Sequence, residues 1–275
     1  LFLALTAVTL TSLLVTVFLL TETYFPKKAT VEREPVSSEP PASSQKNNIF
    51  KEMLDVLKDK VFAIYILAST LGLSLEFLFG EYGGIRLHNE METQPLLTGL
   101  PWFGDVSGVE MFGNLKMENT FLVVLIAPLI ALLTRRLSNR SSLLGGLVLY
   151  AAGFAVLGVS TTPWVLLLAM LVVTIGELMH IPVKQAFLGD LAPEDRRSSY
   201  LAVNGISFVG SMQIAAIGVF VGGFLSSWVM SVCFVGVGLI SVVLFGRILP
   251  ELERRQSGVT DAPAVVKMEE IGPSV

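Results

Sequence analysis

The chain has 275 residues, of which 52% are hydrophobic and only 15% are charged. This composition is far from that of an average soluble domain and argues against a soluble protein. The formal net charge of −4 says little about partners, because the charges are sorted along the chain rather than pooled. The single cysteine, Cys233, excludes an intrachain disulfide and indicates a small core residue rather than a reactive thiol.

Seven apolar segments alternate with polar connections along the chain. They comprise residues 1–20, 61–79, 119–134, 143–160, 163–183, 200–223 and 226–246. Because a helix rises about 1.5 Å per residue, about twenty apolar residues cross a hydrocarbon core of roughly 30 Å. The third segment is short, and we expect it to borrow flanking residues. The sequence therefore predicts an all-α, polytopic bundle of seven transmembrane helices in contact with a lipid bilayer.

The basic residues predict the orientation of these helices. If the connections are assigned alternately to two sides, 17 of the 19 Lys and Arg residues fall on one side, and only Arg86 and Lys116 fall on the other. By the positive-inside rule the first side is cytoplasmic. We therefore expect the N-terminus of the first segment outside and the C-terminal tail, 248–275, in the cytoplasm.

The first segment and the connection after it carry distinct signals. Residues 1–20 are expected to be a genuine span, because no charged leader precedes them and no small-residue cleavage site follows. In the cytoplasmic loop 21–58, residues 29–48 are rich in Pro, Ser and Glu, which predicts a disordered linker. Apolar residues then recur at helical spacing between positions 49 and 57. They indicate either an amphipathic helix on the inner membrane face or a cytoplasmic extension of the next span.

Residues 59–247 are predicted to form a six-helix bundle with one long outer loop, 80–118. Loops of this length are uncommon unless they are functional or disordered. The other outer connections, near residues 161–162 and 225, are tight. The fourth and fifth segments, and the sixth and seventh, are therefore expected to form antiparallel helical hairpins.

Charged residues at membrane depth are costly and need an explanation. Glu76 lies about one turn from the outer end of the second segment. It is either a carboxylate that reaches the outer headgroups or a cavity-facing proton or cation site.

Glu177 and His180 lie on one face of the fifth segment, because three positions separate them. Glu177 is expected roughly 21 Å from the outer end of its helix, in the inner half of the bilayer. A Glu-x-x-His pair also occurs in di-metal carboxylate bundles, but these need a second such pair, and the only other histidine is His88. We therefore expect no metal site. Glu177 is predicted to pair with a cytoplasmic-side Arg, and His180 either joins that network or simply packs.

Small residues form a row along the sixth segment. The row contains Ser207, Ser211, Ala215, Gly218 and Gly222. Such rows allow close contact between helices. Asn204 and Gln213 on the same segment offer hydrogen bonds toward a neighbouring helix or a cavity. The candidate proton or substrate residues are therefore Glu76, His180, Asn204 and Gln213.

Residues 128–140, Pro-Leu-Ile-Ala-Leu-Leu-Thr-Arg-Arg-Leu-Ser-Asn-Arg, resemble the second copy of the signature loop of the major facilitator superfamily. That signature reads roughly Gly-x-x-x-Asp-Arg-x-Gly-Arg-Arg. Arg136 and Arg140 match it, whereas Ala131, Arg135 and Ser138 depart from it. Because Arg135 stands where the family has Asp, the usual charge relay cannot be intact in this half.

Residues 176–200 are similar to the junction of the tenth and eleventh helices in bacterial multidrug-type members of the superfamily. The stretch contains Gly176-Glu177, Pro182 and the run from Leu188 to Tyr200, in which Arg197-Ser198 replaces the usual Arg-Gly pair. With this alignment, residues 1–20 would be the sixth helix of the family and the later segments its helices seven to twelve. The chain would then be a fragment that lacks five helices.

The resemblance implies a C-terminal six-helix bundle that faces a missing N-terminal bundle across a substrate cavity, in a bacterial cell membrane. It also implies an inner-gate charge network, which would consist of Arg135, Arg136, Arg140, Glu177, Asp190 and Arg197. The family alternates access by rocking its two bundles. The leading hypothesis is a fragment of a secondary transporter, a permease or antiporter that exports small organic compounds in exchange for protons. The proton and the export direction come from the resemblance alone.

Two other classes of function fit the sequence less well. A seven-helix membrane receptor shares the predicted topology, but the chain has no Asp-Arg-Tyr after the third span and no Asn-Pro-x-x-Tyr in the seventh. An intramembrane enzyme would need a nucleophile with its base or a metal cluster, and neither Gly-x-Ser-x-Gly nor His-Glu-x-x-His occurs. We therefore expect no enzymatic activity, no cofactor and no nucleic-acid partner, but a small-molecule substrate.

Overall fold

The computed structural model describes residues 51–97, 104–193 and 196–256. Within these ranges, six helices are long and apolar enough to cross a membrane. The elements in chain order are α3 (Lys60–Leu78), the π-helix η1 (Phe79–Gly83), α4 (Gly84–Glu90), β1 (Gln94–Pro95), β2 (Asp105–Val106), α5 (Gly108–Thr134), α6 (Asn139–Leu157), α7 (Pro163–Leu191), α8 (Arg197–Gly222) and α9 (Ser227–Gln256). The all-α bundle predicted from the sequence is thus confirmed for its second to seventh segments. The first segment, the linker 29–48 and most of the tail lie outside the described residues.

The helices begin where the sequence provides capping groups. The Asp59 carboxylate accepts hydrogen bonds from the amides of Val61 and Phe62 at the start of α3. Ser107 and Glu110 form a reciprocal capping box at the start of α5. Such caps satisfy backbone amides that have no partner within the helix, and each typically contributes about 1 kcal/mol.

The predicted outer loop 80–118 is largely structured. The helix that begins at Lys60 continues through η1 and α4 to Glu90, and a two-stranded antiparallel hairpin follows, with Gln94 opposite Val106. Helix α5 begins at Gly108, so the third span starts eleven residues before the predicted position. The polar sequence before Asn119 concealed this start, because its apolar density is too low to mark a span. We call the end of the bundle with α4 and the β-strands the hairpin end.

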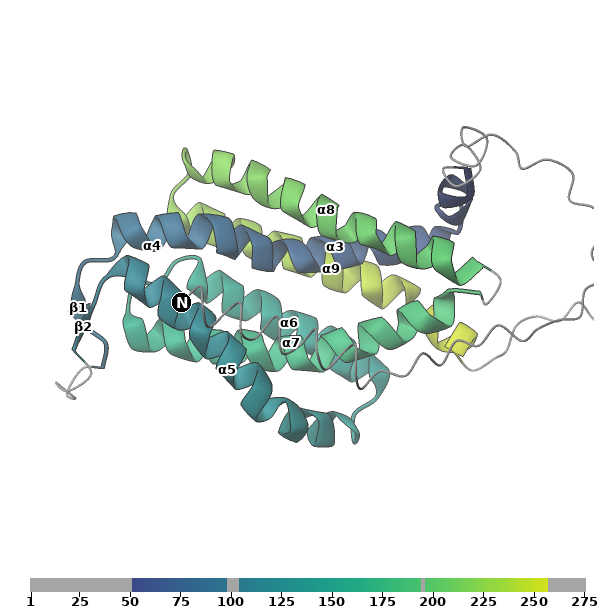
Figure 1. The fold of residues 1–275 in the computed structure, drawn as a ribbon, viewed down its shortest axis with the longest axis horizontal. Helices are drawn as coiled ribbons and strands as arrows, with labels where there is room; N and C mark the ends of the chain where they lie inside the picture. The colour runs from purple at the N-terminus through teal and green to yellow at the C-terminus, as the bar shows by residue number, and fades with distance from the viewer. Residues whose placement is uncertain (1–50, 98–103, 194–195, 257–275) are drawn as a thin grey trace, which may run out of the picture. The chain divides into compact units, whose positions relative to one another are not determined.

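The helices form a bundle from which the later half of α5 diverges, and the largest contact joins α6 to α7 (Figure 1). A Cβ atom built on Gly146 would lie 2.8 Å from the carbonyl oxygen of Gly176, and one built on Gly176 would lie 2.6 Å from the carbonyl oxygen of Gly146. Both distances are shorter than a carbon and an oxygen tolerate. The two backbones therefore approach this closely only because both positions are glycine.

The row of small residues on α8 faces α3, in agreement with the prediction that this row contacts another helix. Ser211 donates a hydrogen bond to the carbonyl oxygen of Thr70 (2.8 Å), and Ala215 is buried. A Cβ atom on Gly218 would lie 2.0 Å from Leu78. Helix α3 also packs on α9, and α5 packs on α7.

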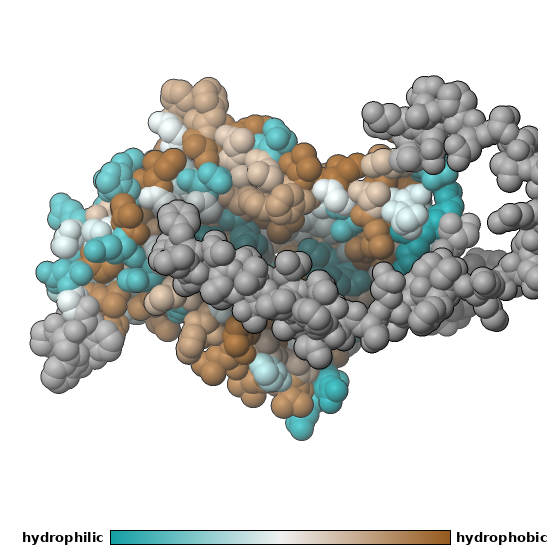
Figure 2. Space-filling view, viewed as in Figure 1, coloured by the Kyte–Doolittle hydropathy of each residue, from teal (hydrophilic) through white to brown (hydrophobic). Residues whose placement is uncertain are grey.

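Two apolar clusters fill the bundle, one toward each end. Leu75, Phe79, Phe154 and Phe234 belong to the cluster near the hairpin end. The second cluster includes Val56, on the short helix 51–56, which packs with the far ends of α3, α7 and α9. Large apolar side chains are also exposed along α5, α8 and α9. On the face shown in Figure 2, hydrophobic patches lie above and below the middle of the bundle, as expected for surfaces that contact lipid.

Candidate functional site

Polar side chains from four helices meet near the middle of the bundle. Glu76 lies halfway along the continuous helix Lys60–Glu90, and Glu177 lies midway along α7. Asn119 on α5 and Tyr150 on α6 also lie near the middle of their helices. Because α4 and the last turns of α7 extend the helices beyond the apolar segments, both carboxylates lie closer to mid-helix than the sequence predicted.

These side chains hydrogen-bond one another across helix boundaries. The Asn119 amide Nδ2 lies 3.1 Å from Oε2 of Glu177 and 3.0 Å from Oγ1 of Thr174, and it donates to both. The Tyr150 hydroxyl donates to Oε2 of Glu76 over 3.4 Å. Each carboxylate is therefore held by a neutral donor from another helix, and its negative charge is not neutralised by that donor.

A pocket opens between these groups, and we call it the central pocket. Its polar lining consists of Glu76, Lys116, Asn119, Tyr150 and Glu177, and its apolar walls are Phe79, Phe154, Met170 and Val173. Its cavity volume is about 10 Å³, which is room for one water-sized group. The four charged or amide side chains are half-buried, whereas Tyr150 is buried. The pocket is thus small, bounded by aromatic and aliphatic side chains, and acidic on one side.

His180 lies one turn beyond Glu177 and is buried. Its Nδ1 lies 2.7 Å from the carbonyl oxygen of Gly176, and its ring packs against Tyr150, with 4.9 Å between the ring centres. It does not line the central pocket. His180 therefore packs against Tyr150 outside the pocket lining, which agrees with the packing alternative considered from the sequence.

The charges around the central pocket are mixed. Glu76 and Glu177 repel each other as like charges. Lys116 attracts Glu177, and Lys184 attracts Glu76. Within the described ranges, no three His, Cys, Asp or Glu side chains are grouped as a metal site would require. The arrangement can bind a proton or a small cation through carboxylate oxygens, since two nearby carboxylates favour any positive charge between them.

The residues predicted to form the inner gate lie apart from Glu177. Arg135, Arg136 and Arg140 are exposed around the turn between α5 and α6, and the described part of the chain provides no ion-pair partner for them. Asp190 is exposed near the end of α7. Arg197, at the start of α8, reaches back to within 3.8 Å of the Cβ position of residue 189. The structure therefore brings Arg197 close to the end of α7, but it holds Glu177 at the central pocket.

Asn204 and Gln213 lie on α8, away from the central pocket. Asn204 is half-buried, and Gln213 is exposed. Gln213 lines a second pocket between α3 and α8, with a cavity volume of about 410 Å³, together with Phe77, Glu81 and Met212. We call it the side pocket. It is mostly apolar and contains one carboxylate.

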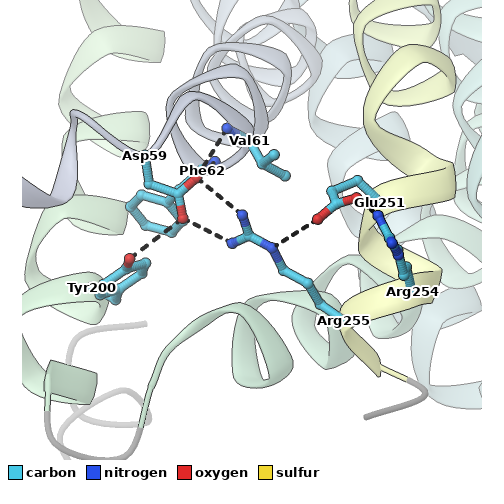
Figure 3. A network of polar contacts seen from close by, with 7 residues as sticks. All are labelled: Asp59, Val61, Phe62, Tyr200, Glu251, Arg254 and Arg255. Carbon is cyan, nitrogen blue, oxygen red and sulfur yellow. Dashed lines mark hydrogen bonds and ion pairs between the residues drawn. The ribbon is translucent and has the colours of Figure 1, made fainter. Parts of the chain in front are cut away.

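A polar network links α3, α8 and α9 at the end of the bundle opposite the hairpin (Figure 3). The Arg255 guanidinium of α9 donates to both carboxylate oxygens of Asp59, over 2.8 and 3.3 Å, and to Glu251 over 3.4 Å. The Tyr200 hydroxyl of α8 donates to Asp59 over 3.4 Å. Burial alone would raise the pKa of Asp59, but the Arg255 guanidinium and the amides of Val61 and Phe62 hold it below its ordinary value of 3.8.

Sequence reasoning missed three residues of the central pocket, namely Lys116, Asn119 and Tyr150. Lys116 and Asn119 fell at or before the predicted start of the third span. The spacing Ser107-x-x-Glu110 was the signal that could have placed them inside a helix, because it is a capping box. Tyr150 carries no such signal, since a tyrosine in an apolar segment is an ordinary core residue.

Comparison with known proteins now identifies the fold family. A family model described as Major Facilitator Superfamily matches residues 117–270, which is more than half of the chain. The chain belongs to this superfamily. Glu177 lies within the matched range, and Glu76 lies before it.

A relative of this chain is described as a "Na(+), Li(+), K(+)/H(+) antiporter" of Planococcus maritimus. It is 27% identical over 164 residues, which is 60% of this chain and 39% of the relative. The chain thus matches well under half of the relative's length. Membership of the superfamily confirms a multi-pass membrane protein, and it does not favour the seven-helix receptor considered from the sequence.

Proposed function

We propose that the full-length protein is a secondary transporter that works by alternating access and exchanges protons for a monovalent cation at the central pocket. The observation that carries this proposal is the pair of carboxylates, Glu76 and Glu177, held at mid-helix by Tyr150 and Asn119. The superfamily and the printed description of the relative from Planococcus maritimus support it. Transporters place substrate and coupling ions near the bilayer midplane, and the mid-helix position of these side chains supports the proposal.

The chemistry of exchange follows from the charge of the pocket. Two carboxylates that are close together in a low-dielectric site repel each other, so that a proton or a cation bound between them is stabilised. Hard cations prefer oxygen ligands, and Glu76, Glu177 and the Asn119 side chain can offer them. A proton and a metal cation then compete for one site. Competition of this kind couples the release of one to the binding of the other.

The remaining parts of the proposal concern the whole protein. The hairpin end would face outward, and the C-terminal end would face the cytoplasm of a bacterial cell, as the basic residues predict. A second helical bundle would cover the central pocket from the opposite side. Arg135, Arg136, Arg140, Asp190 and Arg197 would then meet partners from that bundle when the inner side closes.

Exchange can be measured in everted membrane vesicles that contain the full-length protein. Respiration builds a pH gradient, and Na⁺, Li⁺ or K⁺ is added while a fluorescent weak base reports the gradient. We expect Glu76→Gln and Glu177→Gln each to abolish cation-dependent collapse of the gradient. The exposed Glu92→Gln, at the hairpin end, is the matched control and should behave as the wild type. Full exchange by both pocket variants would overturn the proposal.

The side pocket favours a second candidate, the proton-coupled export of small organic compounds expected from the sequence. Its volume and mostly apolar lining are typical of sites for organic ligands. Phe77, which packs edge-on against Phe208, and Glu81 would suit an aromatic cation. Efflux of ethidium that is lost in Glu81→Gln, with no cation-dependent collapse of the pH gradient in the wild type, would favour this candidate over the first.

A further inference from the structure

Lys116 is the one lysine that lines the central pocket within the described residues. It is on α5, about two helical turns from the start of that helix, and its side chain is half-buried. A buried or half-buried ammonium within a membrane span is costly unless neighbouring groups stabilise it. The position of this ammonium therefore needs an explanation.

Two aromatic rings hold the ammonium at the edge of the pocket. Nζ of Lys116 lies 5.8 Å from the centre of the Phe79 ring and 5.9 Å from the centre of the Phe112 ring. It also lies 3.9 Å from the Cβ position of Gly80. Both ring distances are within the range of cation–π attraction. In the described residues it forms no direct ion pair with Glu76 or Glu177, although it lines the same pocket and acts electrostatically on Glu177.

The lysine side chain is long and flexible, so that its ammonium can leave the rings and approach the carboxylates. Its charge is the same as that of a transported monovalent cation. A positive charge that stays beside the carboxylates makes a second positive charge less favourable there. We propose that Lys116 is a tethered competitor, whose ammonium can offset one of the two negative charges of the central pocket and thereby sets the affinity of the pocket for monovalent cations.

This inference rests on the proposed function of the central pocket, but it makes a separate claim. Glu76 and Glu177 bind the cation, whereas Lys116 weakens that binding. Removal of the carboxylates should therefore abolish cation binding, and removal of the ammonium should tighten it. A damaged fold cannot produce tighter binding, which separates the proposed role from a structural one.

The test measures binding of ²²Na⁺ to the purified full-length protein in lipid nanodiscs at one mildly alkaline pH. Lys116→Met keeps the length of the side chain and removes its charge, and we expect it to tighten Na⁺ binding by about tenfold or more. Lys116→Arg keeps the charge and should bind Na⁺ nearly as the wild type does. The matched control is Lys60→Met, at the exposed start of α3, which should change nothing.

Each outcome decides between the two claims. Unchanged or weaker binding in Lys116→Met, with normal binding in the wild type, would overturn the role of Lys116 and leave the proposed function standing. Absence of Na⁺ binding in the wild type and in Lys116→Met would overturn both. Binding that appears only in Lys116→Met would support the tethered competitor.

Discussion

Asp59 connects three helices through a single carboxylate. It caps the start of α3, receives the Arg255 guanidinium from α9 and accepts a hydrogen bond from Tyr200 on α8. Guanidinium groups that donate to both oxygens of a carboxylate form the stronger kind of ion pair. The carboxylate is half-buried, so water screens this pair less than an exposed one.

Substitutions at Asp59 can separate its two roles. Asp59→Asn keeps a side-chain oxygen for the cap but loses the ion pair, whereas Asp59→Ala loses both, and loss of the cap should cost roughly 1 kcal/mol more. We expect the melting temperature of the purified protein at neutral pH to fall in the order wild type, Asn, Ala. Asp55→Asn is the matched control, because Asp55 forms its ion pair with the exposed Lys58. Equal melting temperatures for the three proteins would contradict the assignment.

The effect of pH on this network has a defined sign. The pKa of Asp59 is lower in the folded protein than its ordinary value of 3.8. The stabilisation is therefore fully present above 3.8 and is lost as the pH falls through the lower, folded value. The difference in melting temperature between wild type and Asp59→Asn should accordingly be constant from neutral pH to about pH 5 and shrink below the ordinary pKa.

At the scale of single residues, the sequence identified the carboxylates better than their partners. Glu76 and Glu177 are conspicuous because acidic groups are rare inside apolar spans. The sequence suggested a cytoplasmic-side arginine as the partner of Glu177, whereas in the structure Asn119 donates a hydrogen bond to it. Hydropathy locates a charge along one helix, but it does not indicate which neighbouring helix faces that charge. The pairing across helices therefore could not be derived from one sequence.

Helices α6 and α7 show how an element contact depends on two glycines. The backbones at Gly146 and Gly176 approach within a distance that excludes a methyl group on either side. Gly146→Ala should therefore force the helices apart and lower the melting temperature, at a cost of about 1–3 kcal/mol. The adjacent Gly145→Ala is the matched control, since its Cβ atom would meet only the end of Met179 at 4.0 Å.

Thermal unfolding of the two alanine variants, side by side, checks this prediction. Because alanine has the higher helix propensity, Gly145→Ala should be neutral or slightly stabilising. A Gly146→Ala protein as stable as the wild type would show that the helices can separate at no cost. The close contact between α6 and α7 would then not be a requirement of the fold.

At the scale of elements, the apolar segments predicted six spans in the correct order but not their full lengths. Apolar density falls before Asn119 and after Val183, yet α5 begins at Gly108 and α7 ends at Leu191. Backbone hydrogen bonding continues a helix beyond its apolar part when caps and neighbouring helices satisfy its ends. Residues 84–90 and 108–118 form helix for the same reason, since α4 packs on α5.

For the whole molecule, the orientation of the bundle is open to a direct test. Cys233 is the only cysteine among these 275 residues, and it is exposed on α9 rather than in the core as predicted. Cys233→Ser therefore provides a background for single cysteines in this chain. In that background, Glu92→Cys lies at the hairpin end and Leu137→Cys lies at the opposite end, and both positions are exposed. A membrane-impermeant maleimide should label Glu92→Cys in intact cells and Leu137→Cys only after permeabilisation. The reverse pattern would invert the predicted orientation.

The hairpin end is fastened to the bundle through Arg86, which is only 2% exposed. Its guanidinium donates to the carbonyl oxygens of Leu157, over 3.1 Å, and of Ser160, while Gln94 donates to Thr161 over 2.9 Å. The strands and α4 are thus anchored to the turn between α6 and α7. An antibody fragment bound to the hairpin would consequently travel with these helices during any rocking of the bundle, so that a fluorophore on it would report the tilt of the bundle without a label inside the membrane.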